Sequence, residues 1–186
     1  MFMSILPVHI EDVTVTTDLK TDIPLEKMVN TEKEADYDAD GSNGIVYKIK
    51  EPRATALIFS DGKVVCTGTK SIREAEEAMR IIVERIVGLG VKATEDPETE
   101  VEKIVAAFRL KDTVNLDDVS GKLKGATYDK AKVPAVVYKL SGTDADFLIL
   151  ENKIICTGCK SIKGVQKAMM TMKATLEKTG INIELV

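Results

Sequence analysis

Aromatic residues and histidine are scarce in this sequence of 186 residues. It contains no tryptophan, four phenylalanines, four tyrosines and a single histidine, His9. So few rings argue against an extensive surface on which nucleic-acid bases stack. The single histidine also removes the commonest general base, and no Ser/His/Asp arrangement, glycine-rich phosphate loop or carboxylate pair has usable spacing. We therefore expect no enzymatic activity, no cofactor and no metal.

Cysteines and long apolar runs are also few. The three cysteines are an odd number, which suits a reducing compartment without a disulfide framework. No stretch reaches the ~18–20 consecutive apolar residues that a membrane span needs. Residues 1–7 are apolar but few, and they include no basic residue, so they make a poor signal peptide. These absences predict a cytoplasmic protein without a membrane partner.

The charge balance limits how the chain can meet nucleic acid. The formal net charge is −4, with a sequence pI of about 5.2. Such a chain does not coat nucleic acid by charge alone. Binding through one local face stays open, because net charge averages over all faces. With 44% hydrophobic and 30% charged residues, the composition is typical of a folded globular protein.

The strongest positive pattern is a stretch that occurs twice. Residues 64–72 read V-V-C-T-G-T-K-S-I, and residues 154–162 read I-I-C-T-G-C-K-S-I. Six of the nine positions are identical, and the copies lie 90 residues apart. A period of almost half the chain indicates two copies of one structural unit. We predict a first repeat at residues 1–91, a connector at 92–100 and a second repeat at 101–186.

Both halves show the same predicted order of elements, with strands from alternating and helices from 3.6-residue hydrophobic periodicity. In the first half we predict strands at residues 8–18, 45–49, 54–59 and 63–67, and helices at 22–29 and 71–88. The acidic residues 32–40 are interpreted as a solvated loop. In the second half we predict strands at 101–110, 135–140, 147–150, 153–157 and 181–186, and helices beginning near 115 and 162.

This order predicts an α+β fold. Consecutive strands joined by tight turns form an antiparallel sheet, and one long helix in each half covers one sheet face. Residues 54–59, 64–66 and 154–156 are nevertheless apolar at both alternating positions. An antiparallel sheet with one solvated face normally alternates apolar and polar residues. The uncovered, apolar face of this sheet therefore needs a partner.

The residues resemble those of the archaeal TATA-box-binding proteins. The resemblance rests on residues 57–71, L-I-F-S-D-G-K-V-V-C-T-G-T-K-S, on their partial copy in the second half, and on G-I-V-Y-K at 44–48. It covers roughly residues 8–180. It implies a saddle: two pseudo-symmetric repeats form one curved antiparallel sheet, with helices on the convex side. The concave face of such a saddle lies on the minor groove of A·T-rich DNA.

The resemblance also implies contacts for individual residues. Groove-floor threonines and apolar strand residues correspond to Val65, Thr67, Ile155, Thr157, Leu57, Leu148 and Val105. Lysines that meet phosphates correspond to Lys48, Lys63, Lys139 and Lys153.

The sequence departs from the family at the residues that deform DNA. The family inserts two pairs of phenylalanines between base steps. Of those four positions only Phe59 keeps the ring, and the others read Ser42, Val133 and Leu150. Phe59 is therefore either an intercalating wedge or a packing residue at the end of the sheet.

The two central asparagines of the family are replaced as well. Their positions read Asp12 and Lys103. An ionised aspartate cannot donate a hydrogen bond to the acceptors of the minor groove. Lys103 could compensate by donating to a base or by pairing with Asp12. Both residues could also be ordinary exposed strand residues, if this face no longer binds DNA.

Two further motifs admit more than one interpretation. Cys156 and Cys159 form a C-x-x-C pair, which suits either a redox or metal site or, as we favour, buried thiols. The loop at residues 128–134 carries acidic residues in the family that recruit the B-type initiation factor. Here it reads Y-D-K-A-K-V-P, so the charge that selects this partner has changed.

We therefore expect a transcription initiation factor of the TATA-box-binding type, associated with the nucleoid of an archaeon, with weakened bending of A·T-rich promoter DNA. The alternative is a protein-interaction module or regulator that has lost DNA binding, with a homodimer through the concave face as one form. A third reading is the recognition part of a repair or RNA-processing system. The absence of a catalytic domain counts against this last reading.

Overall fold

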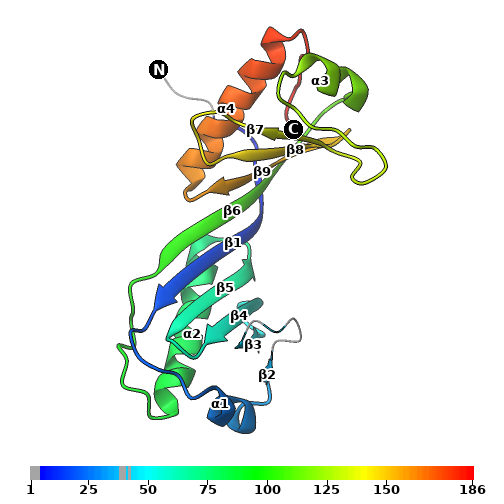
Figure 1. Cartoon of the computed structure of the whole chain (residues 1–186). Coiled ribbons are helices and arrows are strands. Elements are labelled where there is room, and N and C mark those ends of the chain that lie inside the picture. The colour runs from blue at the N-terminus through cyan, green and yellow to red at the C-terminus, as the bar shows by residue number, and fades with distance from the viewer. Residues whose placement is uncertain (1–4, 38–40, 42) are drawn as a thin grey trace. The chain divides into compact units, whose positions relative to one another are not determined.

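The computed structural model describes residues 5–37, 41 and 43–186. These residues form nine strands and four helices in two compact units (Figure 1). The first unit comprises residues 12–102, and the second comprises residues up to 11 together with 103–186. The chain passes between the units inside its two longest strands, β1 (His9–Asp18) and β6 (Glu100–Arg109). Among the described helices, none is both long and apolar enough to cross a membrane.

The first unit contains an antiparallel sheet with strand order β2-β3-β4-β5-β1. Its further elements are α1 (Leu25–Thr31), β2 (Ala35–Tyr37), β3 (Gly44–Ile49), β4 (Ala54–Phe59), β5 (Lys63–Thr69) and α2 (Ile72–Gly88). Alternate strand residues such as Ile45, Ile58 and Val64 are buried, as are Ile82 and Ile86 of α2. Burying each such side chain stabilises the fold by ~1.5–3 kcal/mol, so these residues hold α2 against the sheet.

One element of the first unit differs from the prediction. Residues 32–40 are not simply a solvated loop, because β2 lies within them. Ala35 pairs with Tyr47 of β3 and is buried, and the Tyr47 hydroxyl donates to Glu32 Oε2 at 3.2 Å. The acidic composition of this stretch hid a short edge strand that backbone pairing holds in place.

The second unit repeats the design with strand order β6-β9-β8-β7. Its further elements are α3 (Leu116–Lys122), β7 (Val136–Lys139), β8 (Asp146–Ile149), β9 (Lys153–Cys159) and α4 (Ile162–Lys178). The closing strand expected at residues 181–186 is absent, and only one bridge, Leu110 to Leu185, forms there. The N-terminal segment belongs to this unit, because Gln166 of α4 exchanges two 2.9 Å hydrogen bonds with the backbone of Leu6.

Both long helices begin at a serine cap. Ser71 Oγ accepts from the backbone N–H of Glu74, and Glu74 Oε2 accepts at 2.9 Å from the N–H of Lys70, one residue before the cap, an arrangement close to a capping box. Ser161 Oγ accepts from the N–H of Gly164, but a glycine cannot return the second bond. The helices therefore begin at equivalent residues, 90 positions apart.

Candidate nucleic-acid interface

The sheet of the first unit has a second, half-buried face. Strand residues that alternate with the buried ones point away from the core. Leu57 pairs with both Val46 and Val65, and Val65 pairs with Thr16, so these four residues cross the sheet in one row. All four are half-buried. We call the side chains on this side of each sheet its open face.

The second unit carries an equivalent row. Leu148 pairs with both Val137 and Ile155, and Ile155 pairs with Ala107. The predicted residues Leu57, Val65, Leu148 and Ile155 thus occupy matching places on the two open faces. Val105, on β6, is also half-buried, and Lys103 is exposed. Each unit therefore has an apolar row at the strand positions for which the resemblance implies contact with the groove floor.

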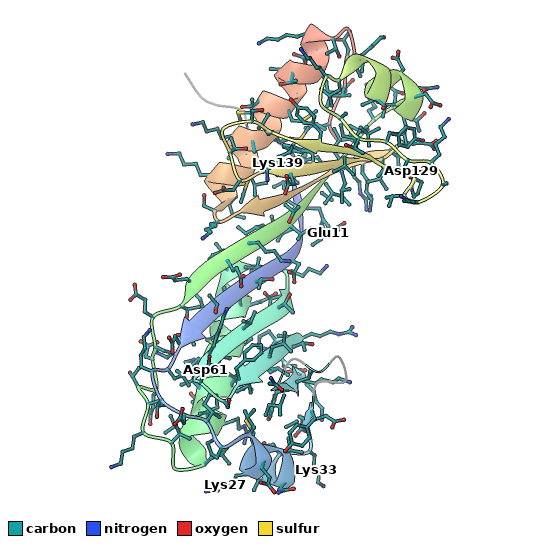
Figure 2. The ribbon with its side chains drawn as sticks, viewed as in Figure 1. Glu11, Lys27, Lys33, Asp61, Asp129 and Lys139 are labelled. Atoms are coloured by element: carbon teal, nitrogen blue, oxygen red, sulfur yellow. The ribbon has the colours of Figure 1, made fainter. Side chains whose placement is uncertain are left out.

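Beside the apolar row, each open face has a row that begins with a lysine and ends with a threonine. In the first unit Lys48, Thr55 and Thr67 are cross-strand partners. In the second unit the corresponding residues are Lys139, Asp146 and Thr157. Lys48 and Lys139 are exposed, and Figure 2 labels Lys139 on the sheet of its unit. An aspartate therefore replaces the middle threonine in the second unit only.

Asp12 is the centre of a hydrogen-bond cluster on the first open face. Its carboxylate accepts from the backbone N–H of Gly68 at 2.6 Å and from the hydroxyl of Thr14 at 2.9 Å. The hydroxyl of Thr67 lies 3.0 and 3.1 Å from the two carboxylate oxygens and donates to them. Asp12 is half-buried, so this replacement is more than an ordinary exposed strand residue.

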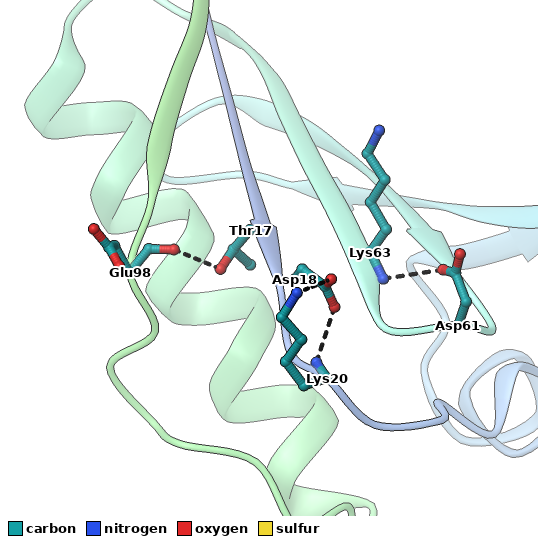
Figure 3. A network of polar contacts seen from close by, with 6 residues as sticks. All are labelled: Thr17, Asp18, Lys20, Asp61, Lys63 and Glu98. Atoms are coloured by element: carbon teal, nitrogen blue, oxygen red, sulfur yellow. Dashed lines mark hydrogen bonds and ion pairs between the residues drawn. The ribbon is translucent and has the colours of Figure 1, made fainter.

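The two turn lysines lie in different surroundings. Lys63 pairs across the strands with Asp18, and its backbone N–H donates to Asp61 Oδ1 at 3.1 Å (Figure 3). Asp18 also accepts from Lys20 Nζ at 2.6 Å, and this hydrogen bond lowers the pKa of the Asp18 carboxyl. The Lys63 side chain points away from Asp61 into solvent.

The acidic character of this end of the first unit extends to the connector. The hydroxyl of Thr17 donates to the backbone oxygen of Glu98 at 2.7 Å, which fastens the connector to β1 (Figure 3). A cavity of about 470 Å³ lies here, lined by Thr16, Thr17, Asp18, Lys20, Asp61, Lys63, Glu98 and Glu100. Four acidic residues and Lys20 thus line the same cavity as Lys63, the phosphate lysine predicted for this unit.

Lys153 of the second unit has a basic cross-strand partner and an acidic neighbour. Its cross-strand partner is Arg109, and its Nζ lies 3.9 Å from the carboxylate of Glu11. The predicted phosphate lysines are therefore not equivalent. One is opposite an aspartate, and the other is opposite an arginine.

The wedge positions are at the ends of the strands. The ring of Phe59 lies over Gly44, since a Cβ built on that glycine would meet two ring atoms at 3.2 Å. Leu150 is half-buried and Val133 is 47% exposed, so both can reach a ligand. Ser42 lies outside the described residues. The wedge roles stay predictions.

The lysines of the loop at 128–134 are paired locally. Lys130 forms an ion pair with Asp117 of α3, and its Nζ lies 5.8 Å from the ring centre of Tyr128. Lys132 lies 3.4 Å from the carboxylate of Asp129, which Figure 2 labels on this loop. Because each lysine is paired with an aspartate, the loop presents less positive charge than its sequence suggested.

All three cysteines are free and buried, which confirms the interpretation as buried thiols. Burial raises the pKa of the Cys66 thiol to about 12. Burial and the neighbouring Cys159 together raise the pKa of Cys156 to about 12. At neutral pH these thiols are protonated and poorly reactive. Among the described residues, no cluster of three or more His, Cys, Asp and Glu side chains could hold a metal ion.

The two units differ in charge. Residues 12–102 contain 20 acidic and 12 basic residues, a net charge of −8. The remainder of the chain contains 10 acidic and 14 basic residues, a net charge of +4. The overall value of −4 therefore hides a basic unit that carries Lys103, Lys139 and Lys153.

Comparison with known proteins decides the family. The family model described as transcription factor TFIID, or TATA-binding protein, matches the chain twice, at residues 7–89 and 98–179. The chain belongs to the TATA-binding protein family. A TATA-box-binding protein of Pyrobaculum islandicum is 33% identical over 174 residues, which are 93% of this chain and 87% of the relative. TATA-box-binding protein B of Halobacterium salinarum is 31% identical and covers 94% of this chain and 95% of the relative.

The solved structure of Methanococcus jannaschii TBP superimposes with a TM-score of 0.83 and 31% identity. The match covers 92% of this chain and 98% of that structure. The predicted fold class, an α+β fold of the TATA-binding protein type built from two repeats, is therefore confirmed.

Sequence reasoning missed several charged residues of the open faces. Asp18, Arg109 and Asp146 enter the site only through the strand register. One signal was available: aligning the two repeats places Asp146 opposite Thr55 and Arg109 opposite Asp18. Reading the two repeats position by position would have revealed the asymmetry of this TATA-binding protein homologue.

Proposed function

We propose that the protein is a transcription initiation factor that binds A·T-rich duplex DNA through the minor groove. The observation that carries the proposal is the apolar row repeated on both open faces, Val46–Leu57–Val65 and Val137–Leu148–Ile155. These side chains are left half-buried or exposed by the rest of the chain, and lysines stand beside them in each unit.

The chemistry of this face suits A·T pairs. In the minor groove A·T pairs present acceptors only, whereas G·C pairs add the guanine amino group. Apolar side chains pack against a groove floor without that group and lose contact where it protrudes. The lysines Lys48, Lys63, Lys139 and Lys153 would meet phosphates and set the register without reading sequence.

The residues at the wedge positions weaken the bending of DNA. Phe59 alone retains an aromatic wedge, while Val133 and Leu150 offer smaller apolar wedges. Smaller wedges unstack base steps less and so give a smaller kink. At an archaeal promoter such a complex would still present the 128–134 loop to a B-type initiation factor. Lys130 and Lys132 are held in ion pairs on this loop, so binding of a B-type factor needs an experiment of its own. A homodimer through the open faces is a further question for experiment.

Bending and binding can be measured together. We expect the protein to shift an A·T-rich duplex specifically and to bend it less than a family member with all four phenylalanines. Energy transfer between dyes at the duplex ends reports the bend, and a salt series separates specific from charge-driven binding. Leu150→Phe should increase the bend, whereas Ile162→Phe on α4, an equally conservative change on a helix, should not. Absence of any specific complex would refute the proposed function.

A further inference from the structure

We propose that Asp12 makes the two units contribute unequally to DNA binding. Its carboxylate takes the hydroxyl proton of Thr67 in the first unit, so that the second unit supplies most of the affinity. This inference rests on the proposed function and specifies which residues limit it. Asp12 is thus an affinity-determining residue of the open face.

The first observation is the set of hydrogen bonds that the Asp12 carboxylate accepts. Its two carboxylate oxygens accept from three donors, the hydroxyls of Thr14 and Thr67 and the N–H of Gly68, at 2.6–3.1 Å. A threonine hydroxyl has one proton to donate. Because Thr67 donates that proton to Asp12, it has none for a base acceptor on the groove floor.

The second unit lacks this arrangement. Lys103 stands where Asp12 stands in the first unit, and an ammonium group cannot accept a hydrogen bond. Within residues 5–37, 41 and 43–186, the hydroxyl of Thr157 takes part in no side-chain hydrogen bond. Its proton is available to an acceptor of the minor groove, as the hydroxyl of Thr67 is not.

Electrostatics act in the same direction. The Asp12 carboxylate, with its three hydrogen-bond donors, lies on the open face and there meets the negative potential of the groove. The first unit as a whole carries −8 and the second carries +4. Lys63 is opposite Asp18, while Lys153 is opposite Arg109. The free hydroxyl of Thr157 and the net charge therefore both favour the second unit, although Asp146 stands opposite Lys139 and Glu11 lies 3.9 Å from Lys153 Nζ.

The test variant is Asp12→Asn. An asparagine oxygen can still accept from Gly68, so the local backbone keeps a partner, while the charge is lost and the amide gains donors. We expect affinity for an A·T-rich duplex to rise about tenfold, with an unchanged preference for A·T over G·C. Glu77→Gln on α2 is the matched control. It removes one negative charge from the same unit at an exposed helix position, and the affinity should not change measurably.

A second comparison separates occupation of Thr67 from simple charge removal. Thr67→Val is introduced into the native chain and into Asp12→Asn. If Asp12 occupies the hydroxyl, the valine costs more affinity in the asparagine background, and the two changes are coupled. Thr157→Val in the native chain should weaken binding more than Thr67→Val does. A purely structural role for Asp12 would instead lower the melting temperature without raising affinity.

The outcomes are distinct. Tighter binding by Asp12→Asn together with coupling to Thr67 supports the proposal. Specific binding by the native chain that Asp12→Asn leaves equal or weaker overturns it and leaves the proposed function intact. If neither chain binds A·T-rich DNA specifically, the proposed function and this inference fail together.

Discussion

Replacing both Lys139 and Lys153 with alanine is expected to weaken DNA binding by roughly 100-fold, with a salt dependence about two units shallower in slope. Lys139 is exposed at the end of the lysine–threonine row, and Lys153 is opposite Arg109 on the basic unit. Each lysine lost removes one phosphate contact and the counterion release that accompanies it. Fluorescence anisotropy with a labelled A·T-rich duplex at several salt concentrations measures both quantities.

The first unit provides the comparison. Alanine at both Lys48 and Lys63 removes the same charge, but the loss should be roughly tenfold or less, because Asp18 and Asp61 already oppose phosphate near Lys63. Alanine at Lys173 and Lys178 of α4 controls for net charge in the second unit and should have little effect. Equal losses from the two lysine pairs of the open faces would contradict the asymmetry.

Gly158→Ala is expected to destabilise the protein by roughly 3–5 kcal/mol, a size reached only by severe steric or packing defects. Gly158 has φ +92, a conformation that side chains rarely adopt. An added Cβ would also overlap the carbonyl oxygen of Asp144, which is backbone and cannot rotate away. Urea unfolding monitored by circular dichroism measures the loss of unfolding free energy.

The duplication supplies a matched control for this change. Gly68 occupies the same place in the first repeat with φ +94, but a Cβ there would meet its nearest atom, Ala54 Cα, at an ordinary 3.7 Å. Gly68→Ala therefore carries the strain of the backbone conformation without the overlap, about 1–3 kcal/mol. Similar losses for both variants would show that Asp144 moves aside easily, contrary to the expected rigidity of this β7–β8 turn.

The fold was predictable because the duplication repeats one strong local pattern. The stretch around Cys66 and its copy around Cys156 fix equivalent strands, caps and helices in both halves. Short elements at the edge were less predictable. The backbone pairing that forms β2 at Ala35–Tyr37 leaves little trace in an acidic sequence, and the expected closing strand reduces to a single bridge at Leu185.

The strand positions of the site residues could be predicted from the sequence, but their hydrogen-bond partners could not. Val65, Thr67, Ile155 and Thr157 lie on the open faces, where the resemblance placed them. The partners of Asp12 depend on the β1–β5 register, which shifts between Val13 and Val15, and no sequence period encodes that shift. The roles of these residues in binding DNA stay predictions, and the hydrogen bonds around Asp12 are what the structure adds to them.

Base substitution in the minor groove tests the central claim most directly. Inosine–cytosine pairs keep the minor-groove pattern of A·T pairs, because inosine lacks the guanine amino group, while their major groove resembles that of G·C pairs. Affinity of the native chain is measured for three duplexes of one length, built with A·T, I·C or G·C pairs. We predict nearly equal binding of the A·T and I·C duplexes and at least about tenfold weaker binding of the G·C duplex. Equal affinity for all three, or an I·C duplex bound as weakly as G·C, would contradict recognition through the minor groove.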